Sequence, residues 1–276
     1  RQVMDEESRN EKKSAQLGSV DVESVPDRNM TPKLDELFTA AMEAEEQADE
    51  AGISAWEAAW QESPGHPDVL DALEKLYEKT RKWPQFADFL KKQTNAVSDN
   101  ARKIYLLMCL ARVYDQHLNQ DVMVVSTYQA VLKVNDKYLP ALNAIIDKYE
   151  KMERWPDLVK MMKVKGEVVT SPEEKISVWL VVAKLFLNRF SNQAETIKAF
   201  EEVLAVDPYH SEAIQYLKEM YEKRRDWEKL VSLMKREVEQ LPDASERVAG
   251  LISIAELTTE RIRRPEICIE RWEAVL

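Results

Sequence analysis

A Tyr followed six residues later by a Trp occurs three times in this chain, in the segments YEKTRKW, YEKMERW and YEKRRDW. Both aromatic residues recur at an interval of 72 residues. The positions are Tyr77, Tyr149 and Tyr221, and Trp83, Trp155 and Trp227. A fixed interval of this size is typical of a helical solenoid, in which each unit buries its apolar face against its neighbours.

Apolar residues keep the same 72-residue register outside the motif. The columns of this register include Trp56/Tyr128/Phe200/Trp272, Leu73/Ile145/Leu217, Leu107/Trp179/Leu251 and Ala111/Ala183/Ala255. Within a block the apolar positions are three, four and seven residues apart, which is the spacing of one buried helix face. Turn signals separate the blocks at Pro64-Gly65, Asp136 and Asp207-Pro208. The pattern predicts an all-α chain, and the low count of 5 Gly agrees with long helices and short turns.

The segment 179–208 resembles a tetratricopeptide (TPR) repeat. The motif positions of its two helices are Trp179, Val182, Ala183 and Phe186, then Thr196, Phe200, Val203 and Pro208. The resemblance implies a right-handed α-solenoid of antiparallel helical hairpins, with two hairpins in each 72-residue double repeat and about seven in all. It also implies that a ligand-binding groove is formed by the first helix of each hairpin.

The alternate hairpins match the family less closely. They keep Tyr77, Tyr149 and Tyr221 at the family's first-helix Tyr position. The position where the family has a small residue is Glu74, Ile146 and Lys218 here. This departure leaves open a half-a-TPR (HAT) relative, and with it an RNA-processing scaffold.

The predicted domains are an N-terminal tail and one solenoid. Residues 1–30 contain few large aliphatic residues and no aromatic residue, so we expect an acidic, disordered tail. Thr31 can cap a helix that starts at Pro32, and the solenoid is predicted over 31–276. Leu276 falls in the middle of the repeat register, so we expect the solenoid to be truncated at its C-terminus.

Charge argues against a nucleic-acid binder. The net charge is −11, and residues 1–50 carry six basic against fourteen acidic side chains. No basic field that would neutralise phosphates is present, so no nucleic-acid partner is expected. No apolar run is long enough to predict a membrane span. Cys109 and Cys268 lie far apart and are interpreted as ordinary apolar residues.

The residue pattern indicates no catalytic or metal chemistry. None of His66, His117 and His210 has a second His or a Cys at metal-ligand spacing. Phosphate-binding loops and nucleophile motifs are absent from the sequence. We therefore predict no catalytic residue, no metal, no cofactor and no enzyme activity.

The Trp residues are interpreted as core. All seven fall in repeat columns. In the Tyr-to-Trp motif the Tyr is expected to close the first helix of a hairpin. The Trp is expected to open the second helix and to fill the gap between the two.

Candidate binding residues are those that break the repeat while facing outward from first helices. They are Arg112, Asn143, Asp147, Lys184, Tyr216 and Glu219. The predicted function is a protein–protein interaction scaffold that binds a partner peptide or helix in the concave groove. Two alternatives stay open: a homo-oligomer that self-assembles through the ends of the solenoid, and the HAT-like scaffold.

Overall fold

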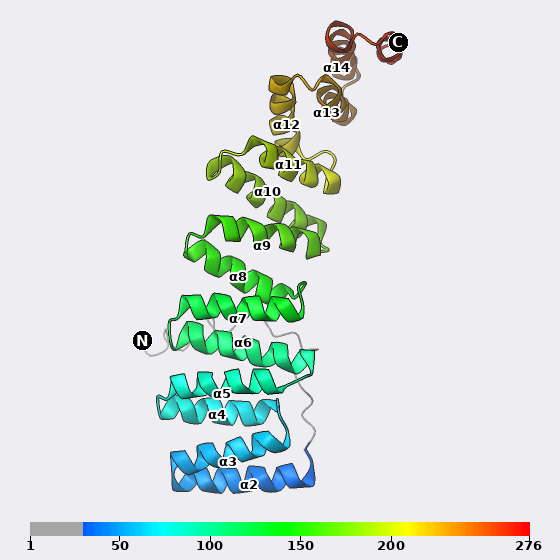
Figure 1. Cartoon of the computed structure of the whole chain (residues 1–276). Helices are drawn as coiled ribbons and strands as arrows, with labels where there is room; N and C mark the ends of the chain where they lie inside the picture. The colour runs from blue at the N-terminus through cyan, green and yellow to red at the C-terminus, as the bar shows by residue number, and fades with distance from the viewer. Residues whose placement is uncertain (1–29) are drawn as a thin grey trace, which may run out of the picture. The chain divides into compact units, whose positions relative to one another are not determined.

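The computed structural model describes residues 30–276, which are helical and contain no strand (Figure 1). The predicted tail, residues 1–30, lies outside the described residues except for Met30. The chain divides into two compact units, and the boundary along the sequence falls between Arg154 and Trp155. The predicted all-α class of helical hairpins is confirmed, and the two units are described separately below.

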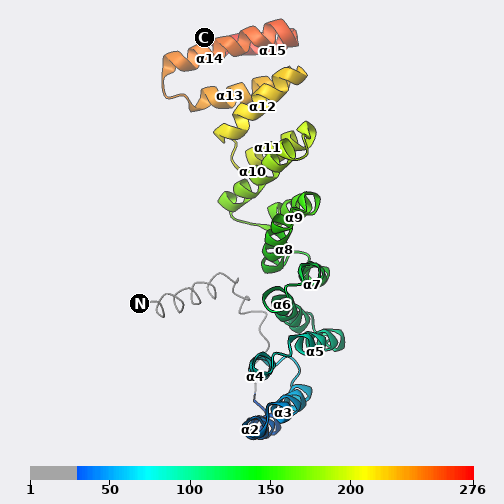
Figure 2. The same ribbon diagram turned by 90° about the vertical axis from the view of Figure 1, so that its left-hand side faces the viewer.

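Unit 1 is a run of helices in which each packs against the next in sequence. They are α2 (Pro32–Gln47), α3 (Asp49–Glu62), α4 (Pro67–Lys79), α5 (Trp83–Ala96), α6 (Asn100–Gln116), α7 (Asp121–Val134) and α8 (Leu139–Lys151). Figure 2 shows α4, α6 and α8 on one side of this unit and α5 and α7 on the other. First and second helices of the hairpins therefore form two separate faces.

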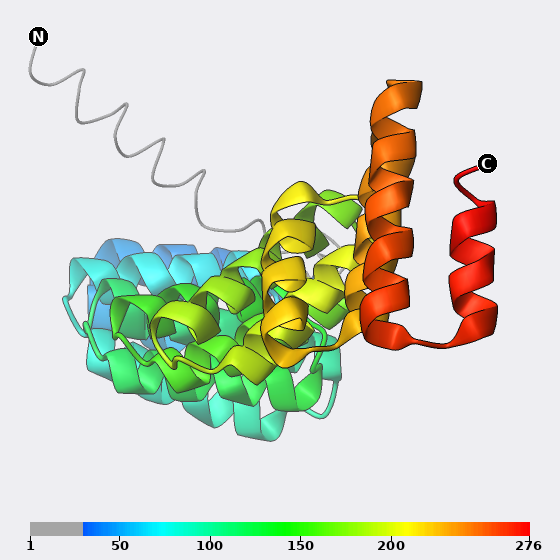
Figure 3. The same ribbon diagram turned by 90° about the horizontal axis from the view of Figure 1, so that it is seen from above.

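Unit 2 continues the same alternation of long helices and short turns. Its elements are α9 (Trp155–Val168), α10 (Pro172–Asn188), α11 (Gln193–Val206), α12 (Ser211–Arg224), α13 (Trp227–Gln240), α14 (Ala244–Leu257), η2 (Thr258–Ile262) and α15 (Pro265–Glu273). The π-helical turn η2 extends α14, and α15 lies beside α14 (Figure 3). Here α10, α12 and α14 are the first helices.

The repeat columns form the core. Leu73, Ile145 and Leu217 are each 0% exposed, in the middle of α4, α8 and α12. The predicted starts and turns are also confirmed. Thr31 caps α2, because its Oγ1 accepts a hydrogen bond from the N–H of Leu34 at 3.2 Å. The three turn signals fall between α3 and α4, α7 and α8, and α11 and α12.

The Tyr-to-Trp motif is a helix-terminating turn with a left-handed residue. Tyr149 lies in the last turn of α8 and Trp155 begins α9. Between them Glu153 has φ 54°, and its counterparts Arg81 and Arg225 have φ 55° and 58°. In each copy the residue before the Trp donates its N–H to the Tyr carbonyl at 2.9 Å. This six-to-one bond with a left-handed residue is a Schellman turn, at which Gly is usually preferred.

Replacing Glu153 with Gly should stabilise the chain. A left-handed conformation costs a residue with a Cβ about 1–2 kcal/mol. Gly removes this cost but loses more conformational entropy, so we expect a net gain of about 1 kcal/mol in the free energy of unfolding. Glu150→Gly, in the exposed helical part of the same motif, should lose about 1 kcal/mol. Urea unfolding of the two variants measures both, and a loss for both would contradict the assignment of the turn.

Candidate functional site

The candidate residues of unit 1 lie on first helices. Asn143 and Asp147 are exposed on α8, and Asp147 pairs with Lys151 one turn further on at 2.7 Å. Arg112, on α6, is half-buried, and its guanidinium donates to Glu74 Oε2 of α4 at 2.6 Å. Asn143 and Asp147 are therefore the unit 1 candidates with the most accessible side chains.

The candidate residues of unit 2 also lie on first helices. Lys184 is exposed on α10 and pairs with Glu212 of α12 at 3.2 Å. Glu219 is exposed on α12 and pairs with Lys223 at 2.5 Å. Both side chains are accessible, and both pairs are of the surface type that contributes little to stability.

Tyr216, also on α12, is directed at the neighbouring helix. Its ring centroid lies 4.6 Å from that of Phe200 of α11, and the residue is half-buried. Burial raises the pKa of its hydroxyl. Tyr216 stands where the other two copies have Ala72 and Ala144. Its ring thus fills space against α11, and less of its surface is open to a ligand than the sequence pattern suggested.

Ion pairs join successive first helices of unit 1. Glu74 of α4 meets Arg112 of α6, and Asp115 of α6 meets Lys148 of α8 at 2.5 Å. Burial raises the pKa of Glu74, and the Arg112 charge acts in the opposite direction. These pairs connect α4, α6 and α8 through their side chains.

In unit 2 a comparable ion pair joins two second helices, α9 and α11. Glu195 of α11 accepts from Lys163 of α9 at 2.5 Å and from Lys198 at 2.7 Å. The hydrogen bonds from Lys163 and Lys198 lower the pKa of Glu195 to about 2.

The lowered pKa predicts a stability loss in acid. Between the ordinary value of 4.5 and about 2, the unfolded chain binds a proton at this site that the folded chain does not. The contribution of Glu195 is therefore complete above pH 4.5 and disappears as the pH falls towards about 2. Glu195→Gln should be less stable than the native chain at neutral pH and equal to it near pH 2. Urea titrations at several pH values measure this, with the exposed Glu202→Gln on the same helix as control; an unchanged difference would contradict it.

The Tyr hydroxyls of the motif have repeated partners on the preceding second helices. Tyr77 donates to Glu57 at 3.0 Å and Tyr221 donates to Glu201 at 2.7 Å, while Gln129 donates to Tyr149 at 2.9 Å. The partners form a 72-residue column of their own. The sequence analysis did not predict these hydrogen bonds. The polar column Glu57/Gln129/Glu201, which keeps the 72-residue interval of the Tyr residues, could have indicated them.

The Trp residues of the motif do not simply fill the gap within their own hairpin, as was predicted. Each ring lies against the end of the next first helix. Trp83 stacks on His117 with centroids 3.5 Å apart, Trp155 lies under Arg189 at 4.4 Å, and Trp227 lies near Arg261 at 5.4 Å. The partners are again 72 residues apart, and all three Trp residues are half-buried. These ring contacts join each hairpin to the next one, along the edge of the solenoid where the turns between first and second helices lie.

The prediction that all seven Trp residues are core is confirmed for three of them and wrong for Trp272, while the three Trp residues of the motif are half-buried at the turn edge. Trp56, Trp60 and Trp179 are buried, but Trp272 on α15 is 42% exposed. Its Nε1 donates to Thr259 Oγ1 at 3.1 Å. Its counterpart Phe200, in the same column, is 3% exposed.

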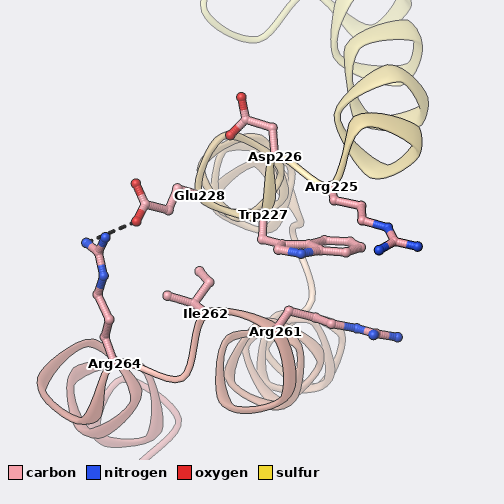
Figure 4. A pocket seen from close by; sticks show the side chains of 7 residues that line it. All are labelled: Arg225, Asp226, Trp227, Glu228, Arg261, Ile262 and Arg264. Atoms are coloured by element: carbon pink, nitrogen blue, oxygen red, sulfur yellow. Dashed lines mark ion pairs between the residues drawn. The ribbon is translucent and has the colours of Figure 1, made fainter.

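Unit 2 has a cleft at the edge where its turns lie. A cleft of about 290 Å³ surrounds Trp227 between the α12–α13 turn and the η2–α15 turn (Figure 4). The residues that line it are Arg225, Asp226, Trp227, Glu228, Arg261, Ile262 and Arg264. No candidate residue predicted from the sequence lies in this cleft.

The part of the chain that the structure describes holds no group of three or more His, Cys, Asp or Glu placed to bind a metal ion. None of the helices among residues 30–276 is both long and apolar enough to span a bilayer. His66 is 1% exposed and packs edge-on against Phe38, and His117 takes part in the Trp83 stack. Cys109 is buried and Cys268 half-buried, and neither forms a disulfide among these residues.

No protein-family model matches the chain, and no curated protein matches it. Solved structures with similar arrangements of helices include a tetratricopeptide repeat protein from Parabacteroides merdae, with 14% identity, a TM-score of 0.39 and coverage of 89% of this chain and 99% of that one. Another is the C-terminal part of a TPR repeat-containing protein from Cytophaga hutchinsonii, with 13% identity, a TM-score of 0.37 and coverage of 88% and 94%. A third is the TPR2AB domain of yeast Sti1 in a complex with pHSP90, with 13% identity, a TM-score of 0.34 and coverage of 88% and 89%. The fold assignment itself rests on the helices described above.

Proposed function

We propose that this chain is a non-catalytic interaction scaffold, which binds a peptide or helix of a protein partner along its first helices. The observation that carries the proposal is the contrast between buried and exposed repeat columns. Leu73, Ile145 and Leu217 keep one apolar character and are fully buried. The exposed positions two residues further on are Lys75, Asp147 and Glu219, which differ in charge.

The buried columns serve packing between hairpins, and we assign the exposed first-helix columns to recognition of a ligand. Packing between hairpins requires the buried columns to stay alike, because each unit rests on its neighbours. Solvated first-helix positions are free of that requirement, and a face whose charges change from copy to copy can discriminate among ligands. Asn143 and Asp147 are the most accessible candidate side chains of this face in unit 1.

The test begins with a peptide ligand selected from a random displayed library. Its affinity is then measured for the native chain and for a variant with Asn143→Arg and Asp147→Lys. The control carries the same charge change on second helices, as Ser126→Arg and Asp88→Lys, both at exposed positions. We expect at least a tenfold loss, about 1.4 kcal/mol, for the first variant and no change for the control. Equal affinities of all three proteins would contradict the proposed face.

Self-association remains a second candidate function because of one observation. Trp272 and Ile269 of α15 are 42% and 59% exposed, whereas Trp56, in the Trp272 column, is 4% exposed. Contiguous exposed apolar side chains favour contact with another apolar surface. Light scattering should then show a mass that rises with concentration, and Trp272→Glu should abolish the rise. A constant monomer mass would remove this candidate.

A further inference from the structure

The cleft around Trp227 is built differently from its two counterparts in the repeat. Its lining includes Arg225, Arg261 and Arg264. The corresponding residues of the first copy are Arg81, His117 and Gln120, and those of the middle copy are Glu153, Arg189 and Asn192. Only in the third copy are all three positions arginine. Three arginines in the lining of one cleft are not needed for the turn, because the other copies form the turn without them.

Two of the arginines lie beside the indole ring without an ion pair among the described residues. Figure 4 shows Trp227 between Arg225 and Arg261, and both guanidinium groups extend past the same edge of the ring. The Arg261 guanidinium carbon lies 5.4 Å from the ring centroid. Within residues 30–276 neither side chain has a carboxylate partner. Arg225 is the left-handed residue of its turn, with φ 58°.

The acidic residues of the cleft are occupied elsewhere. Glu228 pairs with Arg264 at 3.0 Å. Asp226 caps α13, because its Oδ1 accepts from the N–H of Lys229 at 3.4 Å, and its carboxylate points away from the indole (Figure 4). The unpaired charge of the cleft is therefore that of Arg225 and Arg261, and it lies at the positive end of the α13 dipole.

The cleft also has an apolar component. Ile262 lies beside the ring and packs against the core cluster that contains Val231 and Val238. A ligand that fits this cleft carries a carboxylate for the guanidinium pair next to an apolar side chain for Ile262 and the indole. Guanidinium groups bind carboxylates through parallel, charge-assisted hydrogen bonds.

We propose that the Trp227 cleft binds an acidic peptide segment of a protein partner, with a Glu or Asp carboxylate between Arg225 and Arg261. A peptide suits the cleft better than a nucleic acid does. The chain carries a net charge of −11, and two carboxylates flank the cleft, so its positive potential is local. A phosphate backbone needs cations along a track of several phosphates. This site is at the turn edge and is independent of the first-helix face proposed above.

The test uses the whole chain labelled with ¹⁵N and a short synthetic peptide with a Glu-Glu-Leu core. The signal of the Trp227 indole N–H, assigned with Trp227→Phe, should shift on titration. The Trp155 indole signal should not move, since its copy has Glu153 in place of Arg225. A matched peptide with Gln in place of both Glu residues should cause no shift, and added salt should weaken binding.

Arginine variants distinguish binding of the peptide in the Trp227 cleft from a general attraction of the acidic peptide to basic side chains. Arg225→Gln and Arg261→Gln should each reduce the peptide affinity roughly tenfold. Arg189→Gln, which changes the equivalent stacked arginine of the middle copy, should leave the affinity unchanged. No shift of the Trp227 signal, or equal losses in all three variants, would overturn the proposal. Displacement of the peptide by a single-stranded RNA oligomer with a steep salt dependence would overturn it in favour of a nucleic acid. Because Asn143→Arg with Asp147→Lys leaves this cleft intact, the two proposals can fail separately.

Discussion

Trp60→Ala is expected to lower the free energy of unfolding by about 3–5 kcal/mol. Trp60 lies on α3 and is 0% exposed. Its indole N–H donates to Gln93 Oε1 of α5 at 2.9 Å, and its ring meets Phe89 edge-on with centroids 5.6 Å apart. Removing the ring opens a cavity between two successive second helices and leaves the Gln93 amide without this partner. Urea unfolding measures the loss.

The matched control is Trp83→Ala. Trp83 is half-buried and stacks on His117 at the turn edge, so its removal should cost about 1–2 kcal/mol. Hydrogen exchange should add a spatial signature for Trp60→Ala, with the largest loss of protection in α3 and α5. In a repeat architecture stability is a sum of local terms. Equal stability losses in the two variants would contradict the division into core and edge Trp residues.

Gly166→Val should cost about 3 kcal/mol, and Trp179→Leu should recover most of the loss. A Cβ at Gly166 of α9 would lie 2.8 Å from Cε2 of Trp179 in α10. The same two columns hold Val238 and Leu251 in the third copy, where Leu251 packs on the cluster that includes Val238. A small residue faces a large one in the middle copy, and two medium residues face each other in the third.

A double-mutant cycle tests this exchange of volume. Trp179→Leu alone should destabilise by about 2 kcal/mol, because it leaves a cavity beside Gly166. The buried Trp179 indole N–H has no hydrogen-bond partner among the described residues, so part of the loss is offset. The double variant should be more stable than the sum of the single changes predicts, by at least about 2 kcal/mol. Additive losses would show that the pair is not coupled.

The hairpins could be predicted from the sequence because their packing is periodic. The column Leu73/Ile145/Leu217, the Thr31 cap and the inter-hairpin turns depend on local spacing and on the need to bury one helix face. The tetratricopeptide motif positions of 179–208 added the order of first and second helices. Trp272 was mispredicted because membership of a column does not ensure that a neighbour covers it.

The candidate site was less predictable because side-chain direction decides it. Arg112 and Tyr216 break their columns, yet one pairs with Glu74 and the other lies on Phe200. The Trp227 cleft is formed by residues 225–228 together with Arg261, Ile262 and Arg264, which meet because two turns fall on the same edge. The only indication of the cleft in the sequence is that the third copy has arginine at three positions where the other copies do not all have it. This difference is seen only when exposed columns are compared between copies.

The measurement that tests the central claim most directly is site-specific cross-linking of the selected peptide ligand. A photoreactive amino acid replaces Asn143 on first helix α8 in one protein and Ser126 on second helix α7 in the other, both exposed positions of unit 1. The scaffold account predicts that the peptide is captured from position 143 and not from position 126. Capture from 126 alone, or from neither position by a peptide that still binds, would contradict the first-helix face as the binding surface.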